Sequence, residues 1–164
     1  MKSYKRCIIH KQLKEKDIDK FLKLLEYYKK KLSDYNATKN KTVHSVNAFH
    51  TGNILQFEKF KKYAQLIKPH IPYTQKLNIF HIHLLHFYNK GYEGAHDHQT
   101  TEDFSFIAYL QNSEDGHTCF KINNDIIKIK PEKGKLIFFP SNIWHWGEAS
   151  SGNKKLAVGA LKIK

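Results

Sequence analysis

Arginine is almost missing from this 164-residue chain, because Arg6 is its only arginine among 28 basic residues. Bidentate recognition of phosphates and bases favours arginine, so a formal net charge of +13 carried by lysine argues against a dedicated nucleic-acid-binding protein. The lysines are scattered and accompanied by many asparagines, which is typical of a coding bias. We therefore treat nucleic acid as a disfavoured partner, while attraction to polyanions or acidic protein segments stays open.

The chain also lacks cysteine pairs and long apolar runs. Cys7 and Cys119 lie far apart and show no metal-type spacing, which favours reduced thiols over a disulfide framework. No apolar run approaches the roughly 18–20 residues that a membrane span needs, and residues 1–20 are charged throughout, unlike a secretory signal. We expect a soluble, cytoplasmic protein without a membrane partner.

Hydrophobic periodicity divides the chain into a helical front and a strand-rich back. Apolar stripes of helical period predict one helix over Asp17–Leu32, ended by the turn at Ser33–Asn36, and another over about Ile54–Ile67. A short strand is expected around Val43–Phe49. Alternation of period two then predicts strands at Leu77–Tyr88, Phe104–Gln111, His117–Ile122, Ile126–Lys130, Lys135–Phe139 and Lys154–Ile163.

Short strands without intervening helices favour an antiparallel sandwich or barrel, which makes the fold α+β and mainly β. We expect a single domain over residues 1–164, with a helical support region at 1–76 and a β-rich catalytic core at 77–164. In the first of these strands, alternation places His81 and His83 on the face opposite Ile82, with a bulge near Leu84-Leu85. We interpret these two histidines as surface or interstrand residues.

Three of the eleven histidines form a candidate metal site. His96 and His98 lie in an extended segment, where residues i and i+2 point the same way, so two imidazoles can face one ion. His145 follows a strand that ends in proline, about fifty residues later, and can supply a third ligand. Three ligands with open positions beside them is the arrangement that non-haem iron uses to bind small molecules.

Four motifs, in this order, resemble the Fe(II)- and 2-oxoglutarate-dependent dioxygenases, in particular the prolyl-hydroxylase-like branch and small phage or microbial relatives. They are Tyr88–His98, Phe106–Gln111, Gly134–His145 and Lys155–Ala160. The resemblance covers residues 77–164. It implies a double-stranded β-helix, or jelly roll, with two supporting N-terminal helices.

Residue by residue, the resemblance implies metal ligands at His96, His98 and His145. The family's two histidines fall on His96 and His145, and its usual metal carboxylate falls on His98. Asp97 directly follows His96 and would point to the opposite face of the strand. The chain is thus a His-x-His variant, in which three neutral imidazoles leave the iron with its full 2+ charge, a condition that favours anionic 2-oxoglutarate.

The resemblance also implies two residues that bind the far carboxylate of 2-oxoglutarate. The family's basic residue falls on Lys155, at the start of the last strand, and its tyrosine falls on Tyr109, for which a plain core tyrosine is the alternative. Lys154 would point the other way. Ala157 and Gly159 share a face with Lys155, and their small side chains leave room for a cosubstrate, which favours Lys155.

The implied activity is that of an iron hydroxylase. Fe(II), 2-oxoglutarate and O2 would be used to hydroxylate a C–H bond, with ascorbate as a reductant. A protein or peptide side chain such as proline is the candidate substrate, given the branch that the motifs resemble.

A cupin is the alternative fold family. His96 and His98, followed by Glu102, have the spacing of a cupin's first motif, and Gly134–His145 resembles its second. A cupin would use Glu102 as a fourth metal ligand. Its function would be a 2-oxoglutarate-independent dioxygenase, an isomerase or a small-ligand binder, and it would need neither Lys155 nor Tyr109.

Overall fold

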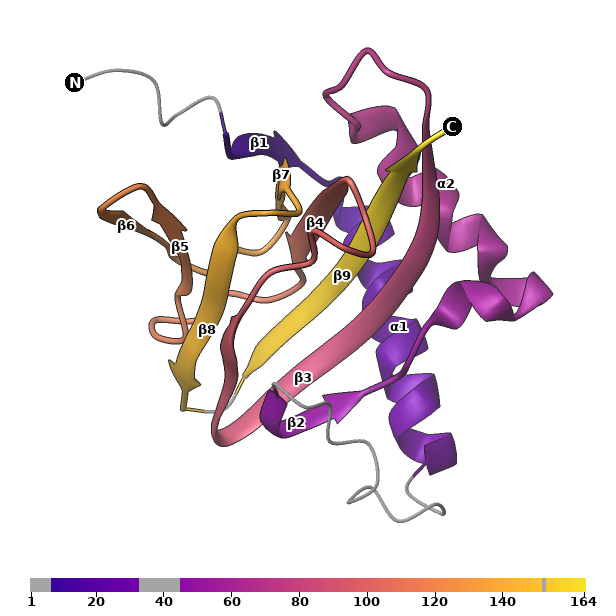
Figure 1. The fold of residues 1–164 in the computed structure, drawn as a ribbon. Coiled ribbons are helices and arrows are strands. Elements are labelled where there is room, and N and C mark those ends of the chain that lie inside the picture. Colours follow the sequence, from indigo (N-terminus) through magenta and orange to yellow (C-terminus); the bar gives the residue numbers. More distant parts are fainter. Residues whose placement is uncertain (1–6, 33–44, 152) are drawn as a thin grey trace.

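Nine antiparallel strands form one curled sheet in the computed structural model, which describes residues 7–32, 45–151 and 153–164 (Figure 1). The sheet order is β1-β7-β4-β9-β3-β8-β5-β6, and β2 pairs with β3. The strands are β1 (Ile9–Gln12), β2 (Ser45–His50), β3 (Leu77–His96), β4 (Phe104–Tyr109), β5 (Thr118–Ile122), β6 (Asp125–Ile129), β7 (Lys135–Pro140), β8 (Trp144–Ser150) and β9 (Lys154–Ile163).

The long strand β3 joins the two halves of this sheet. Its first part pairs with β9 and ends with Phe87 opposite Lys154. Its last part pairs with β8 and ends with His96 opposite His145. Between the two parts, Asn89 has a φ of 47°, a left-handed conformation that turns the chain. As a result, the β8-β5-β6 end of the sheet curls over the interior (Figure 1).

The two faces of the β7-β4-β9-β3 part bury different cores. Helix α1 (Glu15–Leu32) packs on the outer face, where Phe21 and Leu25 join a core that includes Leu84. On the inner face, Leu85 joins a second core that includes Phe120 from the opposite layer. Since successive side chains of a strand point to opposite faces, adjacent residues of β3 belong to different cores.

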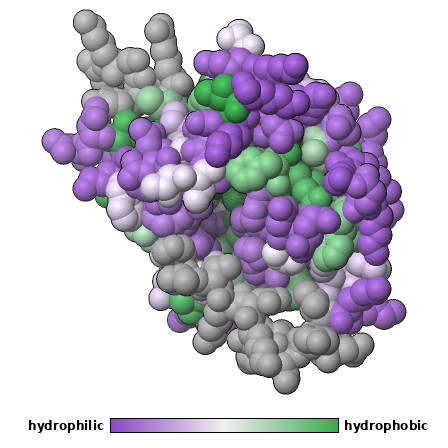
Figure 2. All heavy atoms as spheres, turned by 45° about the vertical axis from the view of Figure 1, so that its right-hand side comes forward, coloured by the Kyte–Doolittle hydropathy of each residue, from purple (hydrophilic) through white to green (hydrophobic). Residues whose placement is uncertain are grey.

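Helix α1 confirms the first predicted helix and begins at Glu15 rather than Asp17. Acidic residues lie in its first turn and lysines in its last turn, which is favourable for the helix dipole. The turn predicted at Ser33–Asn36 lies outside the described residues. Figure 2 shows the helix-bearing side as mainly hydrophilic, with hydrophobic atoms in small areas. Among the described helices, none has the length and apolar character that a bilayer crossing demands.

The second predicted helix is wrong in most of its length. A continuous helix is replaced by short 3-10 segments, in which Phe57 has an extended backbone and interrupts the helical turns. The apolar spacing was correct for packing on the sheet, but the backbone that presents it is not α-helical throughout. The segments are η3 (Ile54–Gln56), η4 (Glu58–Tyr63), α2 (Ala64–Ile67) and η5 (Lys68–His70).

The six predicted strands of the back half are confirmed, with ends that differ by no more than two residues except in β3, which continues to His96. In the β3–β9 ladder the register shift lies between Ile79 and His81 rather than near Leu84-Leu85. The described part of the strand expected around residues 43–49 is β2, and residues 43–44 lie outside the described ranges. Strands β1 and β8 were not predicted.

Candidate metal centre

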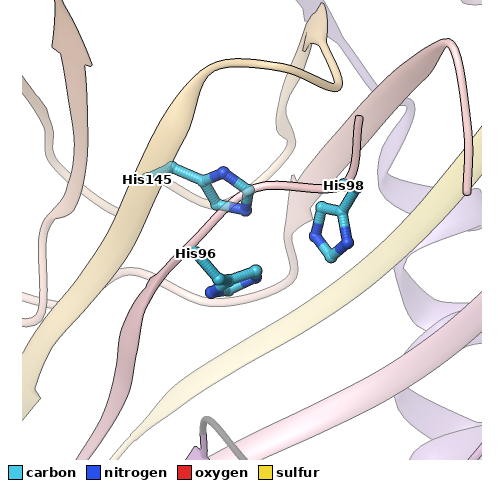
Figure 3. A group of neighbouring side chains, drawn as sticks. All are labelled: His96, His98 and His145. Atoms are coloured by element: carbon cyan, nitrogen blue, oxygen red, sulfur yellow. The ribbon is translucent and has the colours of Figure 1, made fainter. Parts of the chain in front are cut away.

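His96, His98 and His145 converge in the interior of the curled sheet (Figure 3). One ring nitrogen from each lies within 4.8 Å of the others. The ring centroids are 4.4 Å apart for His96 and His145, 4.7 Å for His96 and His98, and 5.3 Å for His98 and His145. This spacing allows three imidazoles to bind a single ion. The predicted set of three histidines is therefore brought together in the structure.

Backbone pairing positions the three rings. His96 and His145 are directly opposite each other in the β3–β8 ladder, so their side chains leave the sheet on the same side. His98 lies just beyond the end of β3, where its backbone N–H donates to the Ser141 carbonyl oxygen at 2.8 Å. Asp97 is not a member of the converging group.

Carbonyl groups set the tautomers of two of the ligands. Nδ1 of His96 lies 2.7 Å from the Gly94 carbonyl oxygen, and Nδ1 of His145 lies 2.9 Å from that of Ile143. When Nδ1–H donates to these carbonyls, Nε2 keeps a lone pair for a metal ion. Burial, reinforced by the neighbouring His96, lowers the pKa of His145 to about 3. This imidazole is thus neutral at pH 7 and ready to bind an ion, so the residues present fit a three-histidine metal site.

A cavity of ≈ 170 Å³ adjoins the three histidines, which form part of its wall. Its apolar walls include Leu85, Ile107 and Leu156, and its other polar groups include Lys154 and Thr118. Trp146 also lines the cavity, whereas Trp144 is half exposed. The space beside the three histidines is therefore largely apolar, and Lys154 and Glu93 are the lysine and the glutamate in its wall.

Lys154 is the basic group of this cavity and is only 2% exposed. Its position opposite Phe87 turns it inward, and its ammonium lies 5.3 Å from the centre of the Phe87 ring. Burial lowers the pKa of Lys154 to about 8, and the charge of Glu93 opposes this shift. Within the described ranges, no carboxylate lies within 4.0 Å of the ammonium. A buried ammonium without an ion pair is costly, and an anionic ligand would supply the missing partner.

Two buried hydroxyl groups lie near this basic end. The hydroxyls of Tyr109 and Thr118 are both inaccessible to water and lack a hydrogen-bond partner of good geometry among the described residues. Burial raises the pKa of Tyr109, and the neighbouring Thr118 hydroxyl opposes the rise. Thr118 lines the cavity itself. Since unsatisfied buried hydroxyls are rare, the Thr118 hydroxyl is suited to donate to a ligand in the cavity, whereas Tyr109 lies behind Thr118 and is not among the lining residues.

The predicted placement of Lys155 in the pocket is wrong. Its ammonium lies 3.5 Å from Glu26 of α1, on the outer face of β9, and its side chain lines a surface groove instead of the cavity. Ala157 and Gly159 share this face, as predicted, but a cosubstrate cannot use the space. A Cβ added to Gly159 would lie 2.4 Å from Cε1 of Phe106, so the small residue accommodates a neighbouring strand.

The fourth ligand of the cupin alternative is not formed. Glu102 is not a member of the converging group, and its carboxylate accepts a hydrogen bond from the Ser105 hydroxyl. Burial raises the pKa of Glu102 to about 7. The structure thus leaves Glu102 beside the metal ligands in sequence but outside their convergence in space.

The chain belongs to the 2OG-Fe(II) oxygenase superfamily, whose sequence model matches residues 56–160. This confirms the family predicted from the four motifs, and Fe(II) and 2-oxoglutarate are the metal and cosubstrate of that family. A search of curated protein sequences gave no significant match.

Solved structures agree with the predicted jelly roll. A viral collagen prolyl hydroxylase from Paramecium bursaria Chlorella virus-1, solved with 2OG, is 19% identical, with 96% of this chain and 97% of that chain covered and a TM-score of 0.63. A prolyl-4-hydroxylase from Pseudomonas putida is 10% identical, with 96% and 93% covered and a TM-score of 0.65. The epimerase SnoN, in complex with Fe3+, alpha ketoglutarate and nogalamycin RO, is 12% identical, with 96% and 79% covered and a TM-score of 0.69. At these identities the similarity establishes the fold, and the predicted fold class is confirmed.

Proposed function

We propose that this oxygenase hydroxylates a side chain of a protein or peptide, with proline as the first candidate, and that Lys154 rather than Lys155 binds the cosubstrate. The observation that carries the proposal is that three converging histidines and a buried ammonium, which has no ion pair in the described part of the chain, line one cavity. A metal ion and a dicarboxylate would satisfy both ends of such a cavity.

His96, His98 and His145 would hold Fe(II), and Lys154 would bind the far carboxylate of 2-oxoglutarate. When bound, the iron supplies the activation of O2 that couples conversion of 2-oxoglutarate to succinate and carbon dioxide with insertion of one oxygen atom into a C–H bond. The chain's own groups do the positioning. Thr118 is placed to donate to the carboxylate that Lys154 attracts, and Tyr109 lies behind Thr118.

The apolar walls and the carbonyl contacts support this role. Leu85 and Leu156 exclude water between the two polar ends of the cavity, which strengthens the attraction between the ammonium and a carboxylate. The Ile143 carbonyl keeps the ring of His145 oriented, so that ligand geometry is present before the metal arrives.

A peptide substrate is supported by a shallow groove next to the cavity. Tyr92 and Trp146 line this groove together with the small residues Gly94 and Ala149. Trp146 and Gly147 line both the groove and the cavity, so the two spaces adjoin. Aromatic walls around small residues suit an extended, proline-containing chain. Two of the three similar structures are also prolyl hydroxylases by name.

Succinate formation tests the proposal. Purified protein is incubated with Fe(II), 2-oxoglutarate, ascorbate and O2, alone and with proline-rich peptides, and succinate is measured beside the peptide mass. We expect succinate from the wild-type protein and none from His145→Ala, and we expect a peptide to gain the mass of one oxygen atom. A matched peptide with alanine at each proline should stay unmodified. Absence of 2-oxoglutarate turnover under all these conditions would contradict the proposed activity.

A further inference from the structure

His83 is a cavity residue that the predicted metal site does not use. Its side chain lines the cavity, and it lies opposite Val158 in the β3–β9 ladder. His96 and His98 line the same cavity as His83. The alternation of side chains in this strand was predicted correctly. Of the two settings expected for His83, surface or interstrand, the surface is wrong, because its side chain lines the cavity.

Two further histidines fix the orientation of this ring. Nε2 of His81 lies 2.9 Å from Nδ1 of His83, and the ring of His50 stacks on it with centroids 4.3 Å apart. In the part of the chain that the structure describes, Nε2 of His83 has no hydrogen-bond partner. One nitrogen is therefore held by a neighbour, and the other is available to a ligand in the cavity.

The chemistry of His83 is that of an uncharged donor. Burial and the neighbouring histidines hold the pKa of His83 well below its usual range, so the ring is neutral at pH 7. If Nε2–H of His81 donates the hydrogen bond to Nδ1 of His83, the neutral His83 ring carries its own proton on Nε2. A ligand that offers only acceptor oxygens would select this tautomer.

The strand register places His83 and Lys154 at opposite ends of one apolar strip. Lys154 pairs with Phe87, four residues along β3 from His83, and the pair of Leu85 and Leu156 lies between them. Four residues of strand correspond to about 13 Å of backbone, and the side chains of His83 and Lys154 both line the cavity that runs between them. Under the proposed function, Lys154 binds one carboxylate of 2-oxoglutarate. The other carboxylate would lie beside the three histidines, where it also requires a hydrogen-bond donor.

We propose that His83 is a positioning residue for the cosubstrate, which donates a hydrogen bond from Nε2 to the 1-carboxylate of 2-oxoglutarate beside the three histidines. In this assignment Nε2–H of His81 donates to Nδ1 of His83, which leaves the proton of His83 on Nε2. This inference rests on the proposed function. It adds a second anchoring point to the one at Lys154 and assigns a role to the His81–His83 pair.

Equilibrium binding of two ligands tests the assignment without turnover. The protein is loaded with Fe(II) under anaerobic conditions, and calorimetry measures the affinity for 2-oxoglutarate and for 2-oxobutyrate. The second compound keeps the 2-oxo acid end but has no far carboxylate. We expect His83→Met to weaken binding of both ligands by about tenfold or more, because a hydrogen bond to a charged group is lost. Lys154→Met should weaken 2-oxoglutarate alone.

Three controls separate the outcomes. His83→Gln keeps an N–H near the position of Nε2 and should retain most of the affinity, whereas His10→Met, on the exposed β1, should bind as the wild type. Thermal unfolding and iron content are measured for each variant. Three outcomes would overturn the assignment of His83 and leave the proposed function standing. They are unchanged binding by His83→Met, a loss of affinity confined to 2-oxoglutarate, and a loss of iron from this variant. Failure of the wild-type protein to bind either ligand would overturn the proposed function with it.

Discussion

Lys154 and Lys155 are neighbours in sequence, yet their ammonium groups lie on opposite sides of β9. Lys154 reaches into the cavity opposite Phe87, and Lys155 pairs with Glu26 of α1 at 3.5 Å. A shift of one residue in the strand exchanges the interior and exterior faces. The choice between these two lysines therefore decides which group meets an anionic ligand.

Exchange of each lysine for methionine should separate their roles. Lys154→Met is expected to weaken 2-oxoglutarate binding by about tenfold or more, because a buried charge-assisted contact is lost. Lys155→Met should leave the affinity unchanged and alter the free energy of unfolding by less than about 1 kcal/mol, as is usual for a partly exposed ion pair. Calorimetric titration of both variants checks this, and the reverse pattern would restore the original assignment of Lys155.

The affinity for 2-oxoglutarate should fall as the pH rises past about 8. Burial lowers the pKa of Lys154 to about 8, so the ammonium is charged below this pH and becomes neutral above it. The neutral amine no longer attracts the far carboxylate. Dissociation constants measured from pH 6.5 to about 9.5 test this in the wild type. In the Lys154→Arg variant the affinity should not fall over this range, since arginine stays protonated. A flat profile in the wild type would show that Lys154 does not contact the ligand.

Iron content should depend on His98 and not on Glu102. His98→Ala removes one of three converging ligands, and we expect it to lose most of its bound iron after gel filtration in the presence of a weak chelator. Glu102→Ala leaves the three histidines in place and should retain iron. Full retention by His98→Ala together with loss from Glu102→Ala would favour the cupin-type ligand set.

Glu102 should make the stability of the fold depend on pH. Burial raises its pKa from the usual 4.5 to about 7, so the folded protein holds this proton more tightly than the unfolded chain does. Stability contributed by the group is present below pH 4.5 and is lost as the pH rises through about 7. Glu102→Gln keeps the acceptor for Ser105 and should stabilise the protein by about 1–3 kcal/mol at pH 8 but little at pH 4.5. Urea unfolding at the two pH values measures the difference, and an equal effect at both would argue against a buried ionisation.

Gly159 should not tolerate a side chain. An added Cβ would lie 2.4 Å from Phe106 and 2.5 Å from the backbone oxygen of His81, so Gly159→Ala is expected to destabilise the fold by about 1–3 kcal/mol. Phe106→Leu in the same chain should recover part of this loss, because only one of the two contacts is relieved. Denaturant unfolding of the single and double variants provides the test. If Gly159→Ala is as stable as the wild type, β4 and β9 can move apart at this position at little cost in free energy.

The convergence of the three histidines could be predicted from the sequence because its signal is local. His96 and His98 are two residues apart in an extended segment, and His145 belongs to a motif that resembles the family. The inward face of β9 could not be predicted in this way. It depends on the pairing of Lys154 with Phe87 and on the packing of α1 against the other face, and both are contacts between distant parts of the chain.

The same limit explains the error over His83. Alternation in β3 correctly separated His83 from Ile82, but alternation cannot say which face becomes the interior. A curled sheet has a polar, ligand-bearing inside as well as an apolar core, so polar residues do not mark the outer face. In the front half, apolar spacing identified the residues that pack on the sheet but not the 3-10 turns that carry them.

The cross-strand pairing of His96 with His145 has a kinetic consequence. These two residues are about fifty positions apart in the chain, yet they are partners in one ladder. An ion bound to both would cross-link β3 and β8. It would hold the ends of the long segment between them together even when the backbone hydrogen bonds of the ladder open locally. Release of the ion and separation of the two strands would then be one event, so the rate of metal exchange would report how often this end of the sheet opens to water.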